Sequence, residues 1–248
     1  MSLYLYGFIE TSAPAPQTPT PGIGGRAVSA IPMGKFFALV SERGSEELTA
    51  DDAVVHSAVL TASLDNHTVI PVRFGTTADH PDDVARLVED NRHILDRLAK
   101  RLRGRMETGV KVFWGKEALK EAVSAYVNLE QVKADSAARP KESYAKAVEV
   151  GQTAERIIAD WRGTVLAGLR DTLAPLADDS AEGRLVSIYM LCNVSFLVRA
   201  RKAEMFKRHV FRLEEQWGET FRIHYVDRLP PFSFSTFAMG RSEEDGRG

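Results

Sequence analysis

Cysteine is nearly absent from this sequence, and long apolar runs are missing. The one cysteine, Cys192, lies in an apolar stretch, so no disulfide can form within the chain and a reducing compartment is favoured. The longest apolar stretch, residues 185–198, is interrupted by Ser187, Asn193 and Ser195. It is shorter than the roughly 20 apolar residues that a membrane-spanning helix needs. The N-terminal residues also lack the basic region of a signal peptide. These features predict a cytoplasmic protein with no membrane partner.

A strong charge of either sign is also missing. The formal net charge is −2 at pH 7, which argues against a nucleic-acid-binding protein held by bulk charge. There is no GxSxG elbow, Walker loop, HExxH pair or paired-cysteine spacing, and the six histidines are scattered. Gly22, Gly24 and Gly25 do not have the spacing of a dinucleotide fingerprint. We therefore predict no enzymatic activity, no metal site, no cofactor and no nucleic-acid partner.

Two short runs of β-branched and aromatic residues organise what is present, at residues 69–74 and 106–114. Each reads as a strand buried on at least one face. Pro71 lacks an N–H, so strand 69–74 should lie at a sheet edge or carry a bulge. Strict alternation points Arg73 away from the face formed by Ile70, Val72 and Phe74. We expect Arg73 to be structural, paired with a carboxylate or capping carbonyl groups.

The first half reads as an α+β domain over residues 1–104, with a small mixed or antiparallel sheet and packed helices. Its expected elements are a strand at 3–9, a Pro/Gly-rich connection at 11–25, a hairpin of strands 27–31 and 35–41, a helix starting at Thr49, strand 69–74, and a helix from Pro81 to Gly104. In the helix after Thr49, the predicted buried stripe is Val54, Val55, Ala58, Val59 and Ala62. His56 lies off that stripe, so we expect it to be structural or solvated.

The second half reads as another α+β domain, residues 105–238, followed by a polar tail at 239–248. Its expected elements are strand 106–114, helices 116–132 and 141–173, a loop at 175–183, strand 184–193 as a central strand, a helix from Ser195 to Gly218, and strand 221–226. Compared with the βαββαβ pattern of ferredoxin-like folds, one strand is missing or hidden near 175–183. We therefore predict a modified ferredoxin-like fold with long helices.

The most charged surface is expected on the helix after Ser195. Arg201, Lys202, Arg208 and Arg212 lie there, near Glu204, Glu214 and Glu215. A solvated helix face is the first interpretation. A docking surface for an acidic protein partner is the second.

Several stretches together resemble the gas vesicle protein GvpL/GvpF family over nearly the whole chain. They are YLYGF at 4–8, His56-x-x-Val59-Leu60, VIPVRFGT at 69–76, ETGVKVFW at 107–114 and LPPFSF at 229–234. Arg228 stands where that family often has glycine. The resemblance implies two α+β domains, the second ferredoxin-like, and no established catalytic residues. It also implies a non-enzymatic accessory protein of gas vesicle assembly. Such a protein would contact the hydrophobic major shell protein GvpA and other accessory proteins, as a chaperone, nucleation factor or minor component.

We expect residues 1–104 to carry the main shell-protein contact. An exposed strand edge can take up a further strand through main-chain hydrogen bonds, and Pro71, Val72, Arg73 and Phe74 are the candidate contact residues. The alternative from a different class is a small-molecule sensor or enzyme built on the ferredoxin-like domain, since that fold hosts many functions.

Overall fold

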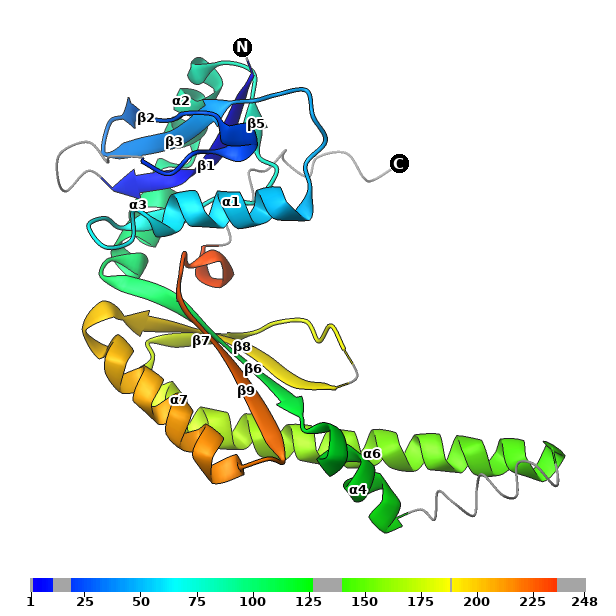
Figure 1. The fold of residues 1–248 in the computed structure, drawn as a ribbon. Coiled ribbons are helices and arrows are strands. Elements are labelled where there is room, and N and C mark those ends of the chain that lie inside the picture. The colour runs from blue at the N-terminus through cyan, green and yellow to red at the C-terminus, as the bar shows by residue number, and fades with distance from the viewer. Residues whose placement is uncertain (1, 11–18, 127–139, 188, 236–248) are drawn as a thin grey trace, which may run out of the picture. The chain divides into compact units, whose positions relative to one another are not determined.

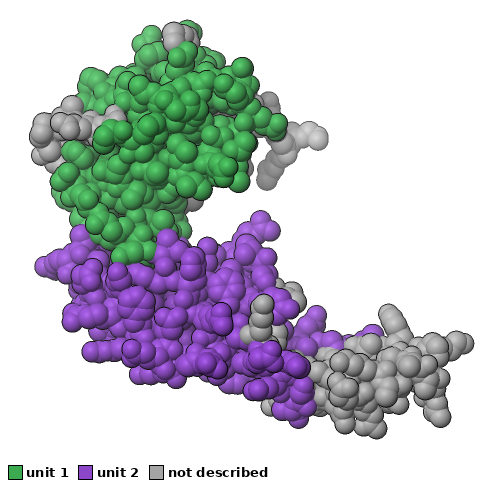
Figure 2. Space-filling model, viewed as in Figure 1, with its two compact units in different colours: residues 1–108, 227–248 green, residues 109–226 purple. Residues whose placement is uncertain are grey.

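A computed structural model describes residues 2–10, 19–126, 140–187 and 189–235. The chain divides into two compact units, residues 1–108 with 227–248 and residues 109–226 (Figure 2). This division corrects the predicted second domain at its C-terminal end, because the described residues 227–235 return to the first unit. The helix end near 132, most of the Pro/Gly-rich connection and the polar tail lie outside the described residues.

The first unit is built on an antiparallel sheet with strand order β2-β3-β1-β4, in which β5 also pairs with β1 (Figure 1). Its elements are β1 (Leu3–Glu10), the 3-10 turn η1 (Ile23–Gly25), β2 (Val28–Met33), β3 (Phe36–Glu42), α1 (Ala50–Thr61), β4 (Val69–Pro71), β5 (Thr77–Ala78), α2 (Pro81–Asp90), α3 (Arg92–Leu102) and η4 (Phe232–Phe234). The predicted first strand and hairpin are thereby confirmed. Strand 69–74 is shorter than predicted.

Two glycines of the first unit occupy positions where a side chain would be unfavourable. Gly34 begins the turn between β2 and β3 with φ of 67°, which suits the first position of a type II′ hairpin turn. Gly7 lies where β1 meets β4, and a Cβ at this position would come within 2.7 Å of the carbonyl oxygen of Ile70. The hairpin and the close approach of β4 to β1 therefore each use a residue without a side chain.

The helices of the first unit begin as the sequence indicates. Thr49 and Asp52 form a reciprocal capping box at the start of α1. The helix predicted from Pro81 to Gly104 is interrupted at Asn91, whose φ and ψ of −111° and 15° separate α2 from α3. The predicted stripe of α1 is correct only in part. Val59 is 2% exposed as expected, but Val54 is 68% exposed and His56, which lies off the stripe, is 1% exposed.

The second unit contains a sheet with strand order β7-β8-β6-β9. The elements of this half are β6 (Arg105–Trp114), α4 (Lys116–Tyr126), α6 (Pro140–Leu173), η2 (Ala174–Leu176), β7 (Asp179–Glu182), β8 (Met190–Arg199), η3 (Ala200–Lys202), α7 (Ala203–Trp217) and β9 (Phe221–Leu229). β6 and β9 each begin or end in the first unit. The chain order is βαββαβ with β6 and β8 in the centre of the sheet, so the predicted ferredoxin-like pattern is present.

The strand that was missing from the sequence pattern is β7, in the segment predicted to be a loop. Its residues are mostly exposed and pair antiparallel with β8, from Asp179 opposite Leu197 to Glu182 opposite Val194. The strand predicted at 184–193 lies later, at 190–199, and is central as expected. α6 and α7 lie along the same face of this sheet (Figure 1). Their buried Val165, Leu169, Phe206 and Val210 complete the core with the strands.

Candidate partner-binding site

The predicted contact strand lies at an edge of the first unit's sheet, as Pro71 indicated. β4 pairs with β1 through Gly7 opposite Pro71 and Ile9 opposite Val69, and it is the last strand in the sheet order. The backbone of Pro71 faces outward, because it lies between the bonded Ile70 and Val72 positions. However, the carbonyl oxygen of Pro71 accepts a hydrogen bond from the hydroxyl of Ser235 at 3.3 Å. The C-terminal segment of the chain therefore covers this edge.

The candidate residues on this edge differ in exposure. Pro71 and Val72 are buried, Phe74 is half-buried, and Arg73 is exposed. No carboxylate of the residues described by the structure forms an ion pair with Arg73, while its backbone carbonyl accepts bonds from the N–H and hydroxyl of Thr76. Of the two structural roles expected for Arg73, pairing with a carboxylate is therefore not found among the residues that the structure describes. Of the four candidate contact residues, Arg73 and part of Phe74 are accessible to a partner.

The stretches that carry the family resemblance meet inside the first unit. The hydroxyl of Tyr4 accepts a hydrogen bond from the N–H of Gly75 at 3.1 Å and lies 2.9 Å from Nδ1 of His56. The rings of Phe74 and Phe232 lie 5.8 and 5.7 Å from the imidazole of His56, centroid to centroid. This cluster links the first strand, α1, the loop after β4 and the C-terminal segment.

Burial sets the protonation of this cluster. It lowers the pKa of His56 to about 4, against a smaller opposing influence of the Val72 backbone, and raises the pKa of Tyr4 to about 12. Tyr4 therefore keeps its proton and donates it to Nδ1 of a neutral His56, which places the imidazole proton on Nε2. The cluster is a structural hydrogen-bond network rather than a catalytic pair, because both groups are buried in the core.

Glu107 joins the remaining two stretches. Glu107 is 5% exposed, and its carboxylate accepts hydrogen bonds from the N–H and the hydroxyl of Ser233, both at 2.8 Å. Ser233 in turn lies two residues before Ser235, which contacts Pro71. The resemblance motifs thus hold the C-terminal segment on the first unit.

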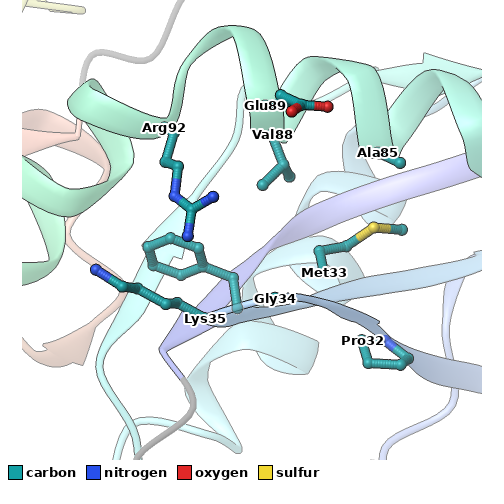
Figure 3. Close-up of a pocket in the computed structure, with 9 residues that line it drawn as sticks. Pro32, Met33, Gly34, Lys35, Ala85, Val88, Glu89 and Arg92 are labelled. Carbon is teal, nitrogen blue, oxygen red and sulfur yellow. The ribbon is translucent and has the colours of Figure 1, made fainter.

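The first unit also carries a groove at its surface. It has a volume of about 310 Å³ and lies between the β2–β3 turn and helix α2 (Figure 3). Its lining residues are Pro32, Met33, Gly34, Lys35, Phe36, Ala85, Val88, Glu89 and Arg92. The hairpin forms one wall and one face of α2 the other, since Ala85, Val88 and Glu89 recur at helical spacing.

The charge in the groove is uneven. Lys35 and Arg92 lie at one end, and Met33 and Ala85 lie toward the other (Figure 3). Lys35 forms an exposed ion pair with Asp96 at 3.4 Å, a type of pair that contributes little to stability. Phe36 and Val88 are buried beneath the groove, at 2% and 8% exposure. An apolar floor with cations at one end can hold a side chain and a carboxylate together.

The basic residues predicted on the helix after Ser195 lie on η3 and α7, with Arg201, Arg208 and Arg212 exposed and Lys202 half-buried. Helical spacing places Glu204 beside Arg208, and Glu215 on the same outward face. This arrangement favours the solvated-face interpretation, because the acidic residues offset much of the positive charge.

The described residues were also expected to hold no metal site and no membrane-spanning segment. Among the residues that the structure describes, no group of three or more His, Cys, Asp or Glu side chains could hold a metal ion. No helix in the described part of the chain is both long and apolar enough to cross a bilayer.

Comparison with known proteins identifies the family of this chain. The model of the family described as gas vesicle synthesis protein GvpL/GvpF matches residues 2–236. The chain belongs to this family. Gas vesicle protein F of a Nostoc species is 28% identical over 240 residues, covering 94% of this chain and 97% of that protein. Gas vesicle protein F of a Streptomyces species is 28% identical over 240 residues, covering 94% and 99%.

Solved structures agree with the family. The crystal structure of the gas vesicle protein GvpF from an Anabaena species superposes with a TM-score of 0.77 at 25% identity, covering 96% of this chain and 99% of that one. GvpF from Microcystis aeruginosa has the same fold, with a TM-score of 0.74 over 94% and 98% of the two chains. GvpL/GvpF membership supports an accessory role in gas vesicles, and the family is not a known enzyme family.

Sequence reasoning found the β4 edge but missed the groove. The groove combines a hairpin turn with two helices that begin more than 40 residues later in the chain. The one available signal was Asn91, whose poor helix propensity interrupts an otherwise periodic pattern beside Arg92. That signal locates a helix break without showing what faces it.

Proposed function

We propose that this GvpL/GvpF chain is a cytoplasmic accessory protein of gas vesicle assembly that binds the hydrophobic major shell protein GvpA. It acts as a chaperone, nucleation factor or minor component, and it also contacts other accessory proteins. Family membership over residues 2–236 is the observation that carries this proposal. A subunit with a large apolar surface needs a partner before assembly, because exposed apolar surface aggregates.

We place the main contact on the first unit, at the groove between the β2–β3 turn and α2. The β4 edge offers little main chain to an added strand, because Ser235 occupies the outward carbonyl of Pro71. The groove instead offers an apolar floor at the surface, and Met33 can adapt to different partner side chains. Docking in a groove is a recurrent mode of peptide recognition.

The cavity in the second unit gives less support to the small-molecule alternative. It has a volume of about 210 Å³ and lies between α6 and the β7–β8 hairpin. Its charged residues, Arg170 and Glu182, form an ion pair with each other. A ligand would have to compete with that pair.

The test is capture of GvpA by the full-length chain. Separated halves cut at residue 104 are unsuitable, because residues 227–235 complete the first unit. Ala85→Arg fills the groove from an exposed helix position, and Ala167→Arg makes the same change at an exposed position of α6. We expect capture to persist in high salt, to be lost in Ala85→Arg and to remain in Ala167→Arg.

Two outcomes would redirect the proposal. Capture that disappears at high salt and in Arg208→Glu, but survives in Ala85→Arg, would move the contact to the outward face of α7. Failure of the folded protein to capture GvpA in any condition would reject GvpA as the direct partner. The presence or absence of the chain in purified vesicles then separates a minor component from a chaperone.

A further inference from the structure

The groove described above has a chemical polarity that defines a class of partner segment. Its floor is made of apolar side chains, Met33, Phe36 and Val88. Lys35 and Arg92 occupy one end of it (Figure 3). A uniformly apolar ligand would leave the guanidinium of Arg92 without a carboxylate, and a purely anionic ligand would leave the apolar floor uncovered.

At this end Arg92 supplies a guanidinium that can receive a carboxylate, and Lys35 adds positive charge beside it. Lys35 is 61% exposed at its side chain, and its pair with Asp96 is long at 3.4 Å. Arg92 is exposed, and no carboxylate of the described residues forms an ion pair with it. Arg92 is also the first residue of α3, where an acidic residue would be the favourable choice, and the first turn of α3 contains none.

The rim indicates an open groove rather than a closed ligand pocket. Pro32, Lys35, Ala85, Glu89 and Arg92 are all exposed, so a chain can enter and leave along the surface. Glu89 lies on the α2 wall and disfavours a ligand that is acidic along its whole length. A volume of about 310 Å³ is at the lower end of ligand pockets, which suits one or two side chains of a longer segment.

We propose that this groove binds a partner protein segment in which one or two large apolar side chains are followed closely by a carboxylate. The apolar side chains cover Met33 and Val88, and the carboxylate lies between Lys35 and Arg92. This inference rests on the proposed partner-binding function, but it does not depend on GvpA being the partner. It sets specificity, because the charge excludes apolar segments that lack an acidic residue.

The experiment selects peptides from a phage-displayed library of random sequences on the immobilised full-length chain. Three variants are selected in parallel: Ala85→Arg to fill the groove, Arg92→Glu to reverse its charge, and Arg97→Glu as the matched control. Arg97 is exposed on the same helix, and it does not line the groove. Intact folding of each variant is verified by its far-UV circular dichroism spectrum and thermal unfolding curve.

We expect the unmodified chain and Arg97→Glu to enrich the same pattern of apolar residues followed by Asp or Glu. Ala85→Arg should enrich no such pattern, and Arg92→Glu should bind the selected peptides about tenfold more weakly. Replacing the peptide's acidic residue by its amide should give a similar loss in the unmodified chain and none in Arg92→Glu. The carboxylate share of the affinity should also fall as salt rises.

The inference is overturned if the selected peptides lack an acidic residue, or if Arg92→Glu and Arg97→Glu behave alike. It is also overturned if a chain ending at Ser235 binds the peptides much more tightly, since the acidic stretch 243–245 would then be the occupant. These results are separable from the proposed function. GvpA capture without the acidic pattern leaves the proposed function intact, whereas the pattern without GvpA capture rejects GvpA alone.

Discussion

Lowering the pH should destabilise the first unit before the second, because His56 in the first unit takes up a proton only when that unit unfolds. Burial lowers the pKa of this side chain to about 4, whereas the ordinary value is 6.5. Between these values the unfolded state binds a proton that the folded state does not, so the free energy of unfolding rises with pH. The contribution of His56 is therefore complete above pH 6.5 and is lost as the pH falls toward 4.

The size of this effect follows from the same interval. Each pH unit between the two pKa values contributes about 1.4 kcal/mol, so the whole interval corresponds to about 3 kcal/mol of unfolding free energy. Most carboxylates stay ionised above pH 5, so they contribute little to the loss between pH 6.5 and 5. About half of that total, roughly 1.5 kcal/mol, should appear in this window.

The assay must distinguish the two units. All three tryptophans, Trp114, Trp161 and Trp217, lie in the second unit around Phe221, so tryptophan fluorescence does not report on His56. Amide hydrogen exchange does report on it. The exchange rates of β1 and β8 are compared after correction for the intrinsic pH dependence of exchange. We expect the opening free energy of β1 to fall with acid while that of β8 changes little.

The decisive variant is His56→Phe, with His224→Gln as an exposed control on β9. His56→Phe leaves the hydroxyl of Tyr4 without its acceptor and should destabilise the first unit at pH 8 by about 1–3 kcal/mol. Its pH dependence between 6.5 and 5 should disappear, however, whereas His224→Gln should retain it. An unchanged slope in His56→Phe would refute the reasoning, because the proton uptake would then belong to another group.

Other substitutions test particular contacts. Arg73→Ala should leave the melting temperature almost unchanged, because the side chain is exposed. A large fall in the melting temperature of this variant would instead show that Arg73 has a structural role. Ser233→Ala should lower the unfolding free energy in urea by about 1.5–3 kcal/mol, since it removes a bond to the buried carboxylate of Glu107. Arg228 has φ of 56°, so Arg228→Gly should be more stable than Arg228→Ala by about 1 kcal/mol; equal midpoints would contradict this. Burial raises the pKa of Cys192 to about 12, so a thiol reagent at pH 8 should label this residue only after unfolding.

Local signals in the sequence were sufficient for many elements. The Thr49–Asp52 capping box located the start of α1, and the spacing around Gly34 located the β2–β3 hairpin. These features form among neighbouring residues, so their chemistry is visible in a short window. β7 was missed because its residues Asp179–Glu182 are mostly exposed, and an edge strand without an apolar face has no periodic pattern.

Sequence alone could not decide which face of α1 is buried. The set Val54, Val55, Ala58, Val59 and Ala62 follows helical spacing, but so does His56 with Val59 and Leu60. The structure selects the second set, because the hydroxyl of Tyr4 supplies the hydrogen bond that makes burial of His56 tolerable. That partner lies 52 residues away in the chain.

The α+β class, the two-part organisation and the family motifs were determined by the sequence itself, since periodicity and turn chemistry are local properties. The tertiary structure alone decided what those motifs do. Ser235 reaches Pro71 across 164 residues and Ser233 reaches Glu107 across 126, so the predicted contact edge is covered and the motifs hold the first unit together. The groove at Lys35 and Arg92 likewise exists only when the hairpin packs beside α2 and α3, because no spacing in the sequence encodes which distant side chains share a surface.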